Sequence, residues 1–145
     1  MDDATYSVLA ERITALVAGW KERLGLRDWT VHVEVLRAGL PPKEQEPENT
    51  SLRKLATVDP SWEYLIATVC FDAPALEDRS AEDLEDVVVH ELVHVLVAEM
   101  RELVPDKCWR CGTDHTRADG AERHEERVVT ALTRVLRDLA KGARP

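Results

Sequence analysis

The chain has 145 residues, of which 44% are hydrophobic, and its formal net charge is −9 at pH 7. This length and composition are typical of one domain built around a single hydrophobic core. Because 28 acidic residues outnumber 19 Lys and Arg residues, most of the surface should repel phosphate backbones. We therefore expect no direct binding of nucleic acid.

No apolar segment reaches the ~18 residues that a membrane-spanning helix needs. Residues 1–26 are charged and periodic, whereas a signal peptide combines a basic start with an uninterrupted apolar stretch. An odd count of 3 cysteines fits a reducing compartment better than a set of disulfides. We expect a cytoplasmic protein that does not bind membranes.

The first segments predict a helix followed by a strand. Residues 3–24 place apolar side chains at steps of three and four, which predicts an amphipathic helix, and Gly25 is suited to end it. Residues 28–36 alternate between apolar and polar side chains, as in a half-buried strand. In this alternation His32 is on the polar side, so we expect it to face solvent.

An exposed loop and two more strands are predicted next. Residues 39–51 contain 3 prolines and many charges, with little to bury, which indicates an exposed loop. Segments 52–58 and 63–71 look extended, and the turn-forming sequence at 59–62 predicts a hairpin between them.

Two long helices are predicted in the second half of the chain. Ser80 is a suitable N-cap, and acidic residues follow it in the first turn of a helix over 81–103. The last helix is predicted over 120–141, with a buried stripe made of Val128, Val129, Leu132, Val135, Leu136 and Leu139. The order of elements predicts a single α+β domain over 1–145.

The predicted helix over 81–103 contains the sequence HELVH at 90–94. Residues four apart on a helix project from one face, so His90 and His94 can bind one metal ion through imidazole nitrogens. Glu91 lies one residue round the helix and can reach a water on that metal. Zinc lowers the pKa of such a water towards ~7, and a carboxylate can take its proton, as hydrolysis requires.

The two histidines could instead be core residues that are satisfied by backbone carbonyls, with Glu91 exposed. The flanking residues argue against this interpretation, because they are almost all Val and Leu and the helix must be buried on most sides. Three polar side chains in such a helix are costly unless they have strong partners, which a metal ion and its water would supply. We therefore expect a Zn²⁺ site.

Catalytic zinc usually has three protein ligands and leaves its fourth position to water. The final helix offers Glu122, Glu125 and Glu126. At about 100° per residue, Glu125 falls in the middle of the predicted buried stripe, whereas the other two lie towards its edges. A carboxylate in a buried stripe needs a partner, so Glu125 is the preferred third ligand, and Glu122 and Glu126 remain alternatives.

The segments HELVH at 90–94 and EERVVTALTRVL at 125–136 resemble the motifs of the gluzincins, a class of zinc peptidases. They are most similar to the small single-domain kind: minigluzincins, ImmA/IrrE-type peptidases and HExxH proteins of phages and bacterial mobile elements. The predicted order of backing helix, short sheet, active-site helix and glutamate helix resembles a zincin-like half-domain.

This resemblance implies that His90, His94 and Glu125 are zinc ligands and that Glu91 is the general base. It also implies a peptide or protein substrate, which would pair with an edge strand of the sheet. The resemblance assigns that edge to the segment 63–71.

The loop between the last two helices contains other metal-binding residue types. SprT-like proteases, which the first helix and strand also resemble, take a third histidine, and His115 is the candidate for that variant. Cys108 and Cys111 form a CxxC pair, but a structural zinc site needs four ligands and the only further cysteine is Cys70. We interpret the pair as loop cysteines that do not bind metal.

The sequence thus predicts a zinc-dependent peptidase. The alternative function is a catalytically inactive, zinc-stabilised binding or regulatory module of a phage or bacterial system. A helix-rich structural domain without metal is the third interpretation, and the oligomeric state is left open.

Overall fold

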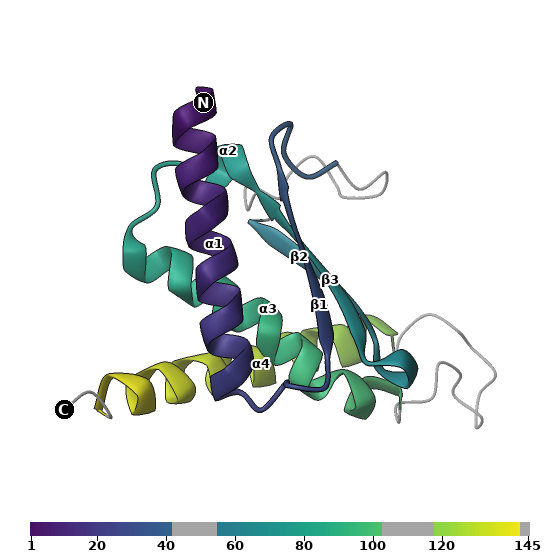
Figure 1. The fold of residues 1–145 in the computed structure, drawn as a ribbon. Coiled ribbons are helices and arrows are strands. Elements are labelled where there is room, and N and C mark those ends of the chain that lie inside the picture. The colour runs from purple at the N-terminus through teal and green to yellow at the C-terminus, as the bar shows by residue number, and fades with distance from the viewer. Residues whose placement is uncertain (42–54, 103–117, 143–145) are drawn as a thin grey trace.

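The computed structural model describes residues 1–41, 55–102 and 118–142. Its elements follow one another in the order α1 (Asp3–Arg23), β1 (Thr30–Leu36), β2 (Ala56–Ser61), the short 3-10 turn η1 (Trp62–Tyr64), β3 (Ile66–Asp72), α2 (Ala73–Leu76), α3 (Ala81–Glu102) and α4 (Ala118–Gly142). The α+β class is confirmed: four helices accompany a three-stranded mixed sheet (Figure 1). Most of the loop predicted over 39–51 lies outside the described residues.

The sheet has the order β1-β3-β2. β1 pairs with β3 in parallel, and β2 pairs with β3 in the antiparallel direction. The expectation that segment 63–71 forms an edge is wrong, because β3 has a strand hydrogen-bonded on each side. The predicted turn at 59–62 is also displaced, since β2 continues to Ser61 and the chain reverses at η1. Pro60 is tolerated within β2 because that strand is at an edge.

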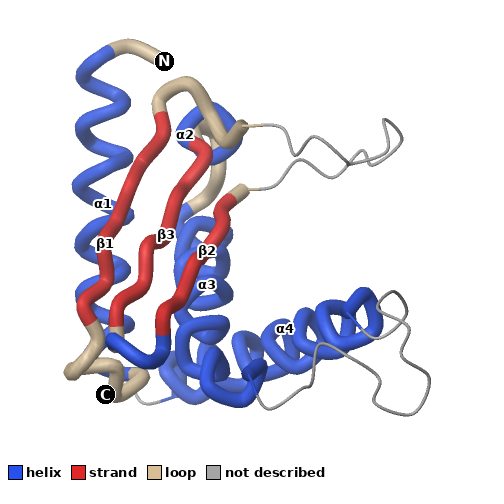
Figure 2. Tube along the Cα trace, turned by 90° about the vertical axis from the view of Figure 1, so that its right-hand side faces the viewer, coloured by secondary structure: helices blue, strands red, loops and turns tan. Residues whose placement is uncertain are grey.

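Helices α1 and α3 cover one face of the sheet, and α4 packs against α3 (Figure 1). Figure 2 shows the opposite face, over which none of the described helices lies. Because side chains alternate along a strand, the register puts Val33, Val69 and Val58 in one row towards the helices, with Val69 fully buried. On the other face His32 is exposed, as predicted.

The core lies between the sheet, α1 and α3. Its fully buried members come mainly from α1, β3 and α3, and they include Ile13, Val69, Phe71, Leu84, Val88, Val89, Leu92 and Val93. The Val and Leu side chains of α3 thus bury this helix, as its sequence predicts. None of the described helices is long and apolar enough to cross a membrane.

Helix α1 ends as its sequence predicts. Gly25 has a φ of +72°, a left-handed conformation that glycine adopts without steric cost. The Gly25 amide donates to the Glu22 carbonyl at 3.2 Å and the Leu26 amide donates to the Lys21 carbonyl at 3.0 Å. This pair of hydrogen bonds is a Schellman motif, which satisfies two carbonyls that the helix leaves open.

Helix α4 is rotated relative to the orientation that its apolar pattern predicts. Three members of the predicted buried stripe are exposed, by 51% to 65%: Val128, Val135 and Leu139. The buried face instead carries Val129, Thr133 and Arg137, which are at most 6% exposed. The prediction that Val128, Val135 and Leu139 are buried is therefore wrong. The polar side chains of Thr133 and Arg137 lie on the face of α4 that meets α3.

One of these polar side chains offers a test of the packing. Among the described residues, the Thr133 hydroxyl has no hydrogen-bond partner. A buried polar group without a partner costs about 1–3 kcal/mol, so Thr133→Val should raise the free energy of unfolding by roughly 1 kcal/mol, measured by urea denaturation. Thr130→Val, at a half-buried position on the same helix, is the control, and a loss of stability only in Thr133→Val would contradict the assignment.

Candidate metal centre

Helix α3 begins at a strong cap, which sets the start of the helix that carries the histidines. The Asp83 amide donates to the Ser80 hydroxyl at 3.1 Å, and that hydroxyl donates to the Asp83 carboxylate at 2.7 Å. The cap that the sequence predicts at Ser80 is confirmed. From there α3 runs between the sheet and α4, so the side of α3 that faces α4 is enclosed.

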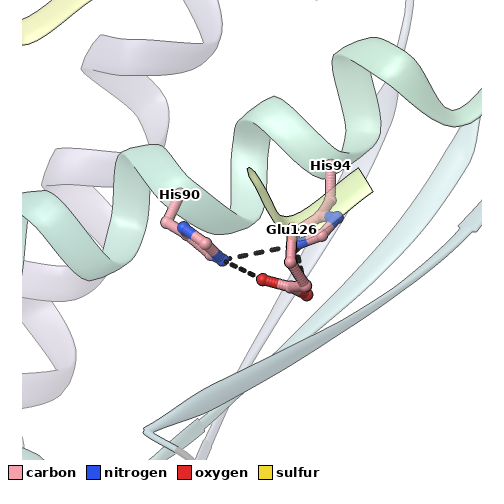
Figure 3. Close-up of side chains that lie close together, drawn as sticks. All are labelled: His90, His94 and Glu126. Carbon is pink, nitrogen blue, oxygen red and sulfur yellow. Dashed lines mark hydrogen bonds and ion pairs between the residues drawn. The ribbon is translucent and has the colours of Figure 1, made fainter. Parts of the chain in front are cut away.

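His90 and His94 project from α3 towards Glu126 of α4 (Figure 3). The two Nε2 atoms are 3.3 Å apart. One carboxylate oxygen of Glu126 lies 3.3 Å from Nε2 of His90, and the other lies 3.3 Å from Nε2 of His94. Among the described residues these three form a group that could hold a metal ion. The spacing of four residues on one helix, from which we predicted a shared ion, is what brings the two imidazoles together.

These distances suit a metal ion better than direct hydrogen bonds. Ligand atoms about 2.0–2.1 Å from a tetrahedral zinc ion lie roughly 3.3–3.4 Å from one another. Two imidazole nitrogens and a carboxylate oxygen are also a donor set that zinc commonly takes. The donor types, and the separation of each nitrogen from the other and from the nearer Glu126 oxygen, are therefore compatible with this ion.

The second ring nitrogen of His94 contacts Glu125. Nδ1 of His94 and Oε1 of Glu125 are 2.9 Å apart, and both side chains are largely buried, at 12% and 15% exposure. An ionised carboxylate can only accept, so Nδ1 of His94 donates to Glu125, and Nε2 of the same ring faces His90 and Glu126. Carboxylates hold metal-binding histidines in this tautomer in many proteins.

The surroundings disfavour a proton on His90. Burial lowers the pKa of His90 and the nearby His94 lowers it further, whereas Glu126 acts in the opposite direction. A metal cation between the two Nε2 atoms and the Glu126 carboxylate would be bound by His90 in its neutral form, which these surroundings favour.

The cluster is enclosed on one side and open on another. His90 is 27% exposed and Glu126 is 52% exposed, whereas His94 is nearly covered. Solvent can therefore reach the group from the Glu126 side. A catalytic zinc site needs such access for its water.

The structure brings together some of the predicted site residues and separates others. Glu91 is buried, at 8% exposure, on α3 between the two histidines in sequence, but it is not a member of the three-residue group. Glu125 reaches the far nitrogen of His94 instead of joining that group. The carboxylate that does join it, Glu126, was weighed from sequence as an alternative.

Other candidates lie elsewhere. Cys70 is on the face of the sheet turned away from α3, with its thiol 3.6 Å from the Glu34 carboxylate, and burial together with Glu34 raises the pKa of Cys70. Cys108, Cys111 and His115 lie outside the described residues. The side chain of Glu122, on α4, is outside them too.

The contact between His94 and Glu125 can be tested without metal. In chelator-treated protein, at a pH where imidazoles are neutral, ¹⁵N NMR should find the His94 proton on Nδ1, because Glu125 accepts it. Glu125→Ala should remove this preference, while the exposed His32 serves as an internal reference. A His94 proton on Nε2 in the unaltered protein would contradict the arrangement.

Comparisons of the chain with protein-family models, with curated proteins and with solved structures found no match. The chemistry of this centre has to be inferred from its own side chains.

Proposed function

We propose that the chain is a zinc-dependent peptidase of gluzincin type. The observation that carries the proposal is the meeting of His90, His94 and Glu126, from two helices, with ligand atoms 3.3 Å apart. It is supported by the element order, in which α1 and the sheet back an active-site helix and a glutamate helix follows. We propose on this basis that the fold is a zincin-like half-domain.

The geometry favours Glu126 as the third ligand, the role for which sequence reasoning preferred Glu125. Only Glu126 lies near both Nε2 atoms, whereas Glu125 contacts the opposite nitrogen of His94. We assign to Glu125 the task of fixing the tautomer and ring orientation of His94. Residues with this task are often nearly as important as the ligands.

The hydrolytic roles follow from this assignment. A bound zinc ion would lower the pKa of water and polarise a peptide carbonyl. Glu91 would accept a proton from the attacking water and deliver it to the nitrogen of the departing amine, so that one water is consumed for each peptide bond broken. Its burial beside a metal would keep this proton transfer away from bulk solvent.

We propose that an extended substrate pairs with β2. This strand is an edge of the sheet, so part of its backbone is not paired with β3, and it packs against α3, which carries the histidines. Pairing at a strand edge supplies main-chain hydrogen bonds that depend little on the substrate sequence. Pro60 removes one donor from this edge.

Zinc binding tests the ligand assignment. The protein should bind about one zinc per chain, measured by metal analysis and by competition with a chromophoric chelator. Glu125→Gln should lower zinc affinity by about 10–100-fold, the loss typical when a group that orients a ligand is removed. Glu126→Gln should lower zinc affinity further, because it removes a ligand itself.

Asp138→Asn is the control, because it removes one negative charge, as the glutamate variants do, from an exposed position on the same helix. It should leave zinc affinity unchanged. If Glu125→Gln abolished binding while Glu126→Gln left it intact, Glu125 would be the ligand. A chain without zinc affinity would remove the basis for the proposed function.

Peptide hydrolysis tests the role of Glu91. Glu91→Gln should retain zinc but lose at least about 100-fold in turnover, because general base catalysis contributes typically 10²–10⁴-fold. The assay follows cleavage of an unstructured peptide library by mass spectrometry. Glu11→Gln, exposed on α1, is the matched control.

Two outcomes would contradict the proposed mechanism or the proposed activity. Hydrolysis that persists in Glu91→Gln would exclude this residue as the base. Full zinc occupancy without cleavage by the unaltered chain would instead favour the zinc-stabilised binding module.

A further inference from the structure

Arg137 of α4 is a buried cation surrounded by acids of α3. Its side chain is 5% exposed and forms ion pairs with Glu85, at 3.2 Å, and with Asp86. It also donates to the backbone carbonyl of Glu82 at 2.9 Å. Lys141, one turn further along α4, forms an ion pair with the Glu82 carboxylate. The carboxyl-terminal half of α4 is thus bound to the start of α3.

The same network extends to α1. One carboxylate oxygen of Glu85 accepts from Arg137, and the other accepts from the indole nitrogen of Trp20 at 2.8 Å. Trp20 is only 3% exposed, so it holds the Glu85 carboxylate against the core. Arg137 therefore pairs with a carboxylate whose own position is determined by a second helix.

This network explains the rotation of α4. Apolar patterning alone would turn Val128, Val135 and Leu139 inwards, but these residues are exposed. Turning Arg137 towards α3 instead also turns Glu126 towards α3, because residues eleven apart on a helix are separated by about three turns and lie close to the same face. Neighbouring residues differ by about 100° around the axis, so the rotation decides which glutamate lies near both Nε2 atoms and which contacts only Nδ1 of His94.

We propose that Arg137 is a positioning residue for the metal centre. By fixing the rotation of α4 through Glu82, Glu85 and Asp86, it presents Glu126 to the two histidines before metal binds. This inference rests on the proposed zinc site and adds to it a residue about 16 Å away along the helix. Pre-organising a ligand in this way reduces the ordering that metal binding must otherwise accomplish.

The guanidinium is suited to this task. Its planar group donates in several fixed directions and can satisfy a carbonyl and two carboxylates together, which an ammonium group on a flexible stem cannot do with the same geometry. Arg137→Lys would keep the charge but lose this simultaneous bonding. The two substitutions Arg137→Lys and Arg137→Met therefore separate charge from geometry.

Zinc affinity of the full chain, measured by chelator competition, tests the proposal. Arg137→Met should weaken binding by about 10–100-fold, the loss expected when a group that orients a ligand is removed, and Arg137→Lys should give a smaller loss. Arg134→Met is the control: it removes the same charge from an exposed position on the same helix and should leave zinc affinity unchanged. Circular dichroism checks that each variant is folded.

A double-mutant cycle separates positioning from general stability. If Arg137 acts through Glu126, Arg137→Met should cause no further loss of zinc affinity in a Glu126→Gln background. An equal loss in both backgrounds, or unchanged affinity in the folded Arg137→Met protein, would overturn the proposal. If Arg137→Met does not fold, unchanged affinity in Arg137→Lys overturns it.

The cycle also distinguishes this inference from the zinc site on which it depends. Zinc binding by the unaltered chain that Glu126→Gln weakens, without any effect of Arg137 variants, rejects the positioning role alone. No zinc binding by the unaltered chain rejects both.

Discussion

The ion pairs of Arg137 with the first turns of α3 are the interaction on which the candidate centre depends. They occur at the opposite end of the helix contact from the histidines, yet they determine which side of α4 faces α3. A buried cation cannot be left unpaired, because the desolvation of its charge would cost several kcal/mol. That requirement outweighs the burial of three apolar side chains on α4, which remain exposed. Electrostatics thus prevails over hydrophobic patterning in placing a carboxylate opposite His90 and His94.

Helix α3 carries two kinds of side chain with opposite needs. Its Val and Leu residues pack against the sheet and α1, while His90 and His94 turn to α4. Enclosure strengthens the contact of His94 with Glu125, because both side chains are largely buried and the effective dielectric there is lower than in water. Burial also disfavours charge on His90, because it lowers the pKa of that imidazole. The same packing therefore positions both histidines and favours the neutral form of His90, which is the form that can bind a metal ion.

Local patterns in the sequence predicted the long helices, the strands and the pairing of His90 with His94, because each depends on residues near one another in the chain. Features that depend on distant residues were missed. β3 is central because it is hydrogen-bonded to two strands that precede it in the chain. The residues 63–71 alone do not indicate whether their strand is central or at an edge. Glu125 was preferred as third ligand from the apolar stripe of α4, and that ligand choice stays a prediction. The stripe itself did not show the contacts of Arg137 with the acids of α3, which lie on the buried face of α4. An arginine among apolar residues, about three turns from the glutamates, was the available signal.

The valines that bury α3 have a consequence for the unfolded chain. β-Branched residues form helices less readily than Leu or Ala, so the segment 87–97 owes its helical state to tertiary packing more than to its own propensity. In an unfolded chain the same run has high β-propensity and few charges, which is the composition of segments that associate into intermolecular β-structure. The stretch that carries the histidines is thus also an aggregation-prone segment whenever the protein unfolds. The folded core protects the chain from self-association as well as positioning the side chains of the candidate metal centre.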